Sequence, residues 1–121
     1  MINYQDRHEE WRKIPEFPNY SVSRSGEIRN DTYDRLLKPA LTNNGGLYVG
    51  FFDKNGQHKR YLSPIVAEAF VVNQTGYEPD IDYDTPMHIN GDKTDCSAGN
   101  LVWATRSQAV AHHRRFKDVQ Q

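Results

Sequence analysis

One histidine lies in a stretch of the chain whose composition could support acid–base chemistry. Residues 87–93, Met-His-Ile-Asn-Gly-Asp-Lys, place His88 directly before a glycine-containing turn. Residues 100–105, Asn-Leu-Val-Trp-Ala-Thr, then lead into a polar, helix-like sequence. A neutral imidazole is suited to take a proton from water, because its ordinary pKa is close to physiological pH. His88 is therefore the first candidate for a general base.

The order of His88, the Gly91 turn and Asn100 resembles the HNH motif of phage and intron-encoded homing endonucleases. This resemblance implies a hairpin and a helix folded around one divalent ion. It also implies that His88 is a catalytic general base that activates water against a DNA phosphate, with Asn100 helping to orient the imidazole. Such chemistry needs a metal ion as well as the base.

Two positions that hold metal ligands in that family are altered here. The residue before the histidine is Met87 rather than an acid, and the position nine residues after Asn100 is Ala109 rather than Asn or His. Mg²⁺ prefers hard oxygen ligands, whereas neither of these side chains has an oxygen and a thioether is soft. We therefore expect no bound metal cofactor, and a divalent ion such as Mg²⁺ only if the nuclease is active. The family also usually has Asn where Cys96 stands.

Other residues near the motif could replace the missing ligands. His112 and His113 follow the altered helix position by one turn, on about the same face. Either could bind a softer ion such as Zn²⁺ or Ni²⁺ together with His88, provided that the helix shifted. Asp92 and Asp95 could also turn inward. The alternative is that His88 is purely structural and is bonded to a strand carbonyl.

Residues 9–30 predict a small β-rich element. Two prolines exclude a regular helix over residues 14–18. Tyr20 and Val22 suggest a strand with period-two alternation, followed by a turn at Gly26. The stretch also resembles the nuclease-associated modular motif, a DNA-binding element that precedes HNH units. The matching residues are Trp11, Ile14, Tyr20, Val22, Ser23, Gly26, Ile28 and Arg29.

Residues 47–52 and 57–62 are β-rich and predict paired strands. The Asn55–Gly56 dipeptide between them favours a type I′ turn, in which both central residues need a positive φ. A helix should follow, with Pro64 in its first turn and Ser63 as its N-cap. The HNH family usually has His-Arg where this chain has Ser63-Pro64, so a histidine and a basic group are lost.

The last helix is predicted to begin with a capping box, in which Thr105 is the cap and Gln108 stands three residues on. Cations gather near the end of this helix, where the helix dipole favours them without any ligand. Contact with phosphate is the functional interpretation. The candidate nucleic-acid-binding residues are Arg24, Arg29, Lys38, Arg106, Arg114, Arg115 and Lys117.

An acidic segment precedes the His88 motif. Glu78, Asp80, Asp82 and Asp84 occupy alternate positions and could lie on one side of an extended segment. A solvated acidic loop is the simplest interpretation. Beside a DNA-cleaving motif, however, the same charge would repel phosphate. It could instead contact a basic surface on a protein partner.

The overall composition sets limits on both size and partners. The chain has 121 residues, a formal net charge of −1 and a pI of about 6.5, whereas a simple DNA-binding domain is usually basic. The single Cys96 excludes an intrachain disulfide and a cysteine-rich zinc site. The polar N-terminus is neither a signal peptide nor a membrane span. We expect a cytosolic protein, in the host cytoplasm if it is phage-encoded.

These observations predict an α+β fold in two parts: a β-rich modular motif over residues 9–62 and a degenerate HNH-like ββα-metal (His-Me finger) hairpin–helix unit over residues 63–117. The first functional hypothesis is a phage-encoded nucleic-acid-binding protein whose cleavage is lost or weakened. The second is a protein-binding phage factor that reuses the scaffold, such as an inhibitor of a host enzyme or defence protein. The third is an active endonuclease or nickase with atypical metal ligands.

The expected partner is thus DNA or a host protein, and the oligomeric state is left open. Active members of the family often carry a further DNA-reading segment after the HNH unit. Here the sequence reaches Gln121 almost directly after that unit.

Overall fold

The structure is a computed structural model that describes residues 9–73 and 82–119, apart from the side chains of residues 117–119. Its strands are β1 (Trp11–Ile14), β2 (Phe17–Ser23), β3 (Ile28–Asn30), β4 (Arg35–Leu37), β5 (Ala40–Leu41), β6 (Leu47–Asp53), β7 (Gly56–Tyr61), β8 (Thr85–His88) and β9 (Leu101–Ala104). Its helices are α2 (Leu62–Phe70), the short 3₁₀ turn η1 (Ala98–Asn100) and α3 (Arg106–Val119). This mixture confirms the predicted α+β class.

The first sheet joins β1 to β4 in chain order, and all of its strands are antiparallel. Tyr20 and Val22 of β2 lie in the hydrophobic core, as their alternation predicts. The serines between and after them are buried as well, so the strand is not half-solvated. Ser21 can be buried because its hydroxyl donates a hydrogen bond to Asp31, at 2.6 Å.

The second sheet contains β5, β6 and β7 in that order. The predicted pairing of residues 47–52 with residues 57–62 is confirmed, with Tyr48 opposite Tyr61 and Phe52 opposite Gln57. The predicted type I′ turn is wrong, because Gly56 has a φ of 114° but Asn55 has no positive φ. Only the glycine therefore supplies a left-handed conformation at this turn.

Helix α2 follows β7 without a linker. Its N-cap is Tyr61, in an extended conformation, so the prediction that Ser63 is the N-cap is wrong. The helix begins directly after Tyr61, and its first residue, Leu62, is almost fully buried in the core. Pro64 lies in that first turn, as expected, where its missing N–H has no helical partner to lose.

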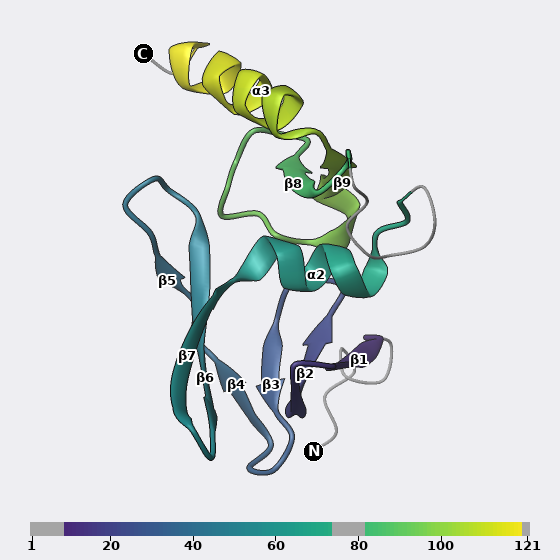
Figure 1. Ribbon diagram of the computed structural model, residues 1–121, viewed down its shortest axis with the longest axis vertical. Helices are drawn as coiled ribbons and strands as arrows, with labels where there is room; N and C mark the ends of the chain where they lie inside the picture. Colours follow the sequence, from purple (N-terminus) through teal and green to yellow (C-terminus); the bar gives the residue numbers. More distant parts are fainter. Residues whose placement is uncertain (1–8, 74–81, 120–121) are drawn as a thin grey trace.

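The core surrounds α2. The helix crosses the middle of the molecule, with the two larger sheets on one side and the β8–β9 hairpin on the other (Figure 1). On the sheet side, the rings of Phe17 and Phe51 stack with centroids 4.5 Å apart. On the hairpin side, the indole N–H of Trp103 donates to the carbonyl of Val71 at 2.9 Å. Each large apolar side chain buried in this core stabilises the fold by about 1.5–3 kcal/mol.

The last part of the chain is the β8–β9 hairpin followed by α3. Residues 89–100 connect the two strands, and α3 packs against β8. The predicted capping box is confirmed: the Thr105 hydroxyl accepts from the Gln108 N–H, and the Gln108 side chain accepts from the Thr105 N–H, both at 3.1 Å. Among the described residues, no helix is both long and apolar enough to cross a lipid bilayer.

Candidate functional site

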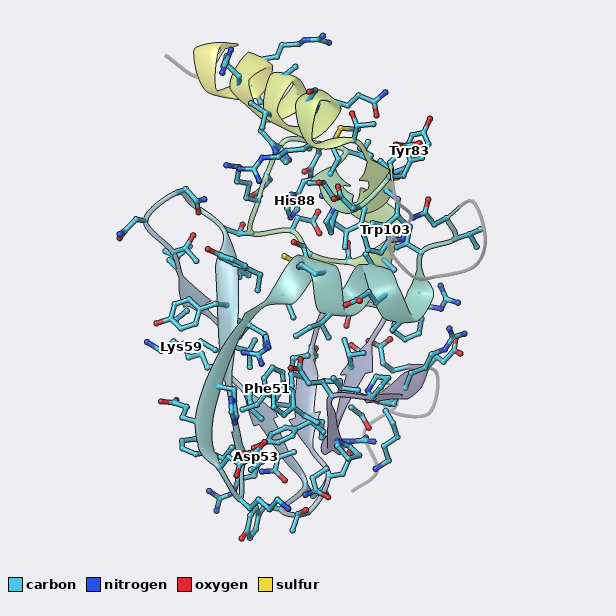
Figure 2. The ribbon with its side chains drawn as sticks, in the orientation of Figure 1. Phe51, Asp53, Lys59, Tyr83, His88 and Trp103 are labelled. Carbon is cyan, nitrogen blue, oxygen red and sulfur yellow. The ribbon has the colours of Figure 1, made fainter. Side chains whose placement is uncertain are left out.

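His88 is the last residue of β8, at the point where the strand passes into the loop of residues 89–100. The loop closes at once, because the N–H of Ile89 donates to the carbonyl of Asn100 at 2.8 Å. Only 5% of His88 is exposed. Figure 2 shows this side chain in the space between α2 and α3. The hairpin therefore buries the histidine on which the sequence motif is centred.

Both nitrogens of the His88 ring face other side chains. Nδ1 lies 3.2 Å from Nε2 of His113 on α3, and Nε2 lies 3.8 Å from Sγ of Cys96. The alternative that His88 is bonded to a strand carbonyl is wrong, because the group that meets its ring is another imidazole.

Burial lowers the pKa of His88 to about 4, and the nearby charges of His113 and Lys93 act in the same direction. The ring is therefore neutral at physiological pH. Because its pKa is lowered, the ring is also a weaker base than an ordinary histidine. A general base works best with a pKa near the operating pH, so the buried ring is poorly suited to that role.

The side chain of Asn100 does not bond to the His88 ring, contrary to the expectation drawn from the HNH resemblance. Its side-chain oxygen accepts from the N–H of Asn90, and its amide donates to the Asn90 side chain and to the carbonyl of Asp95, each at 2.9 Å. All of these partners belong to the loop that follows His88. Asn100 thus closes the loop, and it acts on His88 through the backbone.

Cys96 covers the side of the His88 ring opposite His113. Its thiol lies 3.5 Å from the carbonyl of Lys93, to which it can donate. Burial raises the pKa of the Cys96 thiol to about 11, and the charges of Asp95 and Asp92 add to this effect. The sulfur is therefore a neutral thiol at physiological pH.

The two loop carboxylates do not turn toward His88. Asp92 accepts from the N–H and the hydroxyl of Thr94, and Asp95 accepts from the N–H and the hydroxyl of Ser97. The second oxygen of Asp95 accepts from the Asn90 amide at 3.1 Å. Both acids are used to shape the loop, so the suggestion that they turn inward as replacement ligands is wrong for this conformation.

The residues at the two altered ligand positions do not fit a hard divalent cation. Met87 pairs with Val102 across the hairpin, and successive side chains of a strand point to opposite faces, so Met87 points away from His88. Ala109 is 3% exposed and is packed against its surroundings. Among the described residues, no three His, Cys, Asp or Glu side chains gather as a metal site. These donors provide no oxygen cage for Mg²⁺.

The two adjacent helix histidines hold α3 against the loop. No helix shift is needed to bring His113 to His88, contrary to expectation. His112 Nε2 lies 2.9 Å from the carbonyl of Ile89. A Cβ on Gly91, whose φ is 79°, would lie 2.2 Å from Cγ of Phe116, so the ring packs directly on the glycine backbone. Three side chains of α3 therefore contact the chain on both sides of the turn.

The N-terminal β module also contacts the loop of residues 89–100. A Cβ on Gly26 would lie 3.0 Å from the carbonyl oxygen of Cys96, so the β2–β3 turn packs closely against the loop backbone. The N–H of Ala98 donates to the carbonyl of Arg24 at 2.7 Å. Lys93 reaches the carbonyl of Asn44 at 3.3 Å. The module thus helps to position the residues around His88.

Two of the candidate nucleic-acid-binding arginines have partners within the protein. Arg24 pairs with Glu10 at 3.0 Å and lies over the ring of Phe70. Arg29 pairs with Asp31 at 2.9 Å and lies over the indole of Trp11. Both therefore have a structural role whether or not they also meet phosphate.

The remaining candidate cations are more open. Arg106, Arg114 and Arg115 are exposed on α3, and in the described part of the chain no carboxylate lies within ion-pair distance of them. Lys38 is exposed directly after β4, where it lines a surface groove together with Leu36 and Leu37. The side chain of Lys117 lies outside the described residues. Of the acidic segment, Glu78 and Asp80 are likewise outside them, whereas Asp82 and Asp84 are exposed.

Comparison with known proteins identifies the N-terminal part first. Residues 9–52 match the NUMOD4 motif. The chain is also 35% identical over 115 residues to an uncharacterised HNH endonuclease, L247, of Acanthamoeba polyphaga mimivirus, covering 91% of this chain. The chain is an HNH-type endonuclease homologue with a NUMOD4 motif. Both resemblances seen in the sequence are thereby confirmed.

Two further matches support this placement. A second HNH endonuclease of the same virus, L245, is 29% identical over 103 residues and covers 84% of this chain. The HNH homing endonuclease I-HmuI, whose solved structure concerns DNA binding and cleavage, has a TM-score of 0.72 at 22% identity. That match covers 89% of this chain and 59% of that one, and it shows that the two share a fold. The chain spans only 27% and 29% of the two viral relatives.

The contacts of His88 with His113 and Cys96 were not predicted from the sequence as a pairing of side chains. One observation could have indicated the His113 contact. The histidine pair follows Ala109 by one helical turn, so a helix that packs with Ala109 inward brings His113 to the same side. No comparable feature of the sequence places Cys96 against the other nitrogen.

Proposed function

We propose that this HNH homologue binds DNA and that its metal-dependent cleavage is lost or severely weakened. The proposal is carried by one observation: the ring of His88 is enclosed between His113 and Cys96. A general base must meet the water that it activates, within hydrogen-bond reach. Here the two nitrogens face a second imidazole and a neutral thiol instead.

The ligand positions support the same conclusion. Phosphodiester cleavage of this kind needs a cation that stabilises the charge on the leaving oxygen. Met87 and Ala109 offer no hard donor, and Asp92 and Asp95 are committed to their loop hydrogen bonds. Recruiting either carboxylate would break those bonds, which close the turn next to His88.

DNA is the partner that the homology favours. The chain carries a NUMOD4 motif, and its fold matches that of a homing endonuclease whose structure describes DNA binding. The exposed arginines of α3 supply charges that could contact phosphates without reading bases. We further propose the division at residues 62 and 63 into a modular motif and an HNH-like unit. Both matched relatives are viral proteins, which supports a viral or mobile-element source.

A gel assay on supercoiled plasmid tests both halves of the proposal. The protein is incubated with Mg²⁺, Mn²⁺ or Zn²⁺ in turn, at low and at physiological salt. We expect retarded migration at low salt without conversion to nicked or linear plasmid. Metal-dependent nicking that His88→Ala abolishes would overturn the loss of cleavage and establish an active nuclease with atypical ligands. The absence of any retardation at low salt would overturn DNA binding.

A further inference from the structure

His113 meets His88 at two atoms rather than one. Its Nε2 lies 3.2 Å from the backbone nitrogen of His88 and also 3.2 Å from Nδ1 of the His88 ring. A backbone N–H can only donate a hydrogen bond. The Nε2 atom of His113 must therefore be the acceptor, with its lone pair directed at His88 and its own proton on Nδ1.

This arrangement determines where the proton of His88 lies. If Nδ1 of His88 also carried a lone pair, two lone pairs would face each other at 3.2 Å in a buried site. Placing the proton on Nδ1 replaces that repulsion with a second hydrogen bond to His113. The other nitrogen, Nε2, is then the basic one, and it is the atom that faces Cys96. In this way the partner of one ring nitrogen sets the chemistry of the other.

The rest of α3 keeps His113 in this position. His112 meets the carbonyl of Ile89 at 2.9 Å, and Phe116 packs on Gly91 one turn further along the helix. Asn100 cannot take the same role, since its amide is used on Asn90 and Asp95. The contact between the two imidazoles is thus held by side chains before and after it.

We propose that His113 is the positioning residue of His88: it holds the imidazole with its proton on Nδ1, so that Nε2 is the only basic nitrogen of the ring. The proposal rests on the proposed function in one respect, which is that His88 occupies the general-base position of an HNH site. The predicted tautomer itself requires neither DNA nor cleavage. Any residual base chemistry would take place on the Cys96 side of the ring.

Nuclear magnetic resonance of ¹⁵N-labelled imidazoles tests the proposal directly, because protonated and unprotonated ring nitrogens have well-separated chemical shifts. At about pH 7.5, where a ring with a pKa of about 4 is neutral, His88 of the unaltered protein should be the Nδ1–H tautomer. His113 should carry its lone pair on Nε2. Observation of the Nε2–H tautomer at His88 would overturn the proposal without any substitution.

Two variants then separate positioning from packing. His113→Leu fills similar space but removes the acceptor, so the ratio of Nδ1–H to Nε2–H at His88 should fall roughly tenfold, the equivalent of one hydrogen bond. His113→Gln places an amide oxygen near the lost Nε2 and should restore the original ratio. Ser107→Ala, at an exposed position of the same helix, is the control and should change nothing.

An unchanged ratio in His113→Leu would overturn the proposal, and so would a failure of His113→Gln to rescue it while backbone resonances show α3 in place. Gel retardation of duplex DNA is measured on the same samples. Loss of DNA binding with the tautomer as expected would count against the proposed function alone. Retained DNA binding with a tautomer other than the expected one would count against the positioning role alone.

Discussion

His88 is neutral because the fold removes water from its ring, and this burial couples its protonation to stability. Its folded pKa is about 4 against an ordinary value of 6.5, and burial also lowers the pKa of His113. Between these two pH values the unfolded chain binds more protons than the folded one. Stability must therefore fall as the pH is lowered through this window.

The expected result is a loss of unfolding free energy between about pH 7.5 and about pH 4.5, of the order of 3 kcal/mol from His88 alone. Urea titrations followed by tryptophan fluorescence measure it. His88→Gln removes the titrating group, so its stability should depend less on pH over the same range. Equal slopes for the two proteins would show that His88 is not the group that titrates.

The altered ligand positions give a second prediction at the residue scale. Isothermal titration with Mg²⁺ should detect no tight site in the unaltered protein, and micromolar affinity at physiological salt would contradict this. Met87→Asp combined with Ala109→Asn should raise Mg²⁺ affinity if the scaffold retains the family geometry. Because Ala109 is buried, the added volume should also lower stability, by about 1–3 kcal/mol. Unchanged affinity in a folded double variant would show that the ligand positions are misplaced.

At the scale of elements, α3 is attached to the loop by few but specific contacts. Gly91 is a left-handed residue that also lies directly beneath Phe116, so it is constrained both by its backbone and by its neighbour. Gly56 shares only the first constraint: its φ is 114°, and a Cβ there would meet nothing within 4 Å. Comparing substitutions at Gly91 and Gly56 therefore distinguishes the cost of backbone strain from the cost of displacing α3.

Gly56→Ala should lose about 1 kcal/mol from backbone strain. Gly91→Ala should lose distinctly more, because its Cβ would also displace Phe116. Combining Gly91→Ala with Phe116→Ala removes the clash, so the combined loss should be smaller than the sum of the single losses. Urea unfolding measures all four variants. Additive losses would mean that Phe116 does not pack on the glycine.

Helix α3 also carries the exposed arginines, which gives a prediction about DNA affinity. Plots of the logarithm of affinity against that of salt concentration have a slope set by the number of phosphates neutralised. Replacing Arg114 and Arg115 with alanine should flatten that slope by roughly two units if each neutralises one phosphate. Fluorescence anisotropy with a labelled duplex measures it.

Lys54→Ala is the comparison for the arginine variant, because the β6–β7 turn lies at the opposite end of the molecule from α3 (Figure 1). An unchanged slope in the double arginine variant would remove α3 from the interface. A change in Lys54→Ala alone would place the phosphate contacts at the other end.

For the whole molecule, the net charge of −1 means that the basic helix is offset by acids elsewhere. Asp82 and Asp84 are exposed just before β8, the strand that carries His88. Glu78 and Asp80 precede them in sequence. Acids so close in sequence to the candidate site should either repel DNA or steer a basic protein surface toward it.

Neutralising all four acids to Asn or Gln distinguishes these two partners. If DNA is the partner, the variant should bind duplex DNA more tightly at low salt. If a basic protein is the partner, association should slow, most visibly at low salt where charge steering is strongest. Duplex binding and capture from host lysate are measured in parallel. Tighter DNA binding by the variant, with no partner captured from lysate, excludes the protein-binding alternative. Loss of a captured partner in the variant, with DNA binding still undetectable, excludes DNA as the partner.

The sequence by itself determined the local features of this protein, because they depend on residues close together in the chain. The β6–β7 pairing, the first-turn position of Pro64 and the capping box of Thr105 and Gln108 all follow from local spacing. The motif around His88 indicated the family, and the sequence shows that the side chains of Met87 and Ala109 carry no hard ligand atom. Even the errors, at Ser63 and Asn55, were displacements within a correctly placed element.

Only the tertiary structure decided what surrounds His88. His113 is 25 residues away and Cys96 lies on the other side of the ring. His113 reaches the ring because α3 packs against β8, and Cys96 reaches it because the loop of residues 89–100 folds back beside that strand. The role of Asn100 changed for the same reason: its amide is used up by the loop that it closes. Burial, which lowers the pKa of His88, is a property of the packed molecule, and residue spacing along the chain does not specify it.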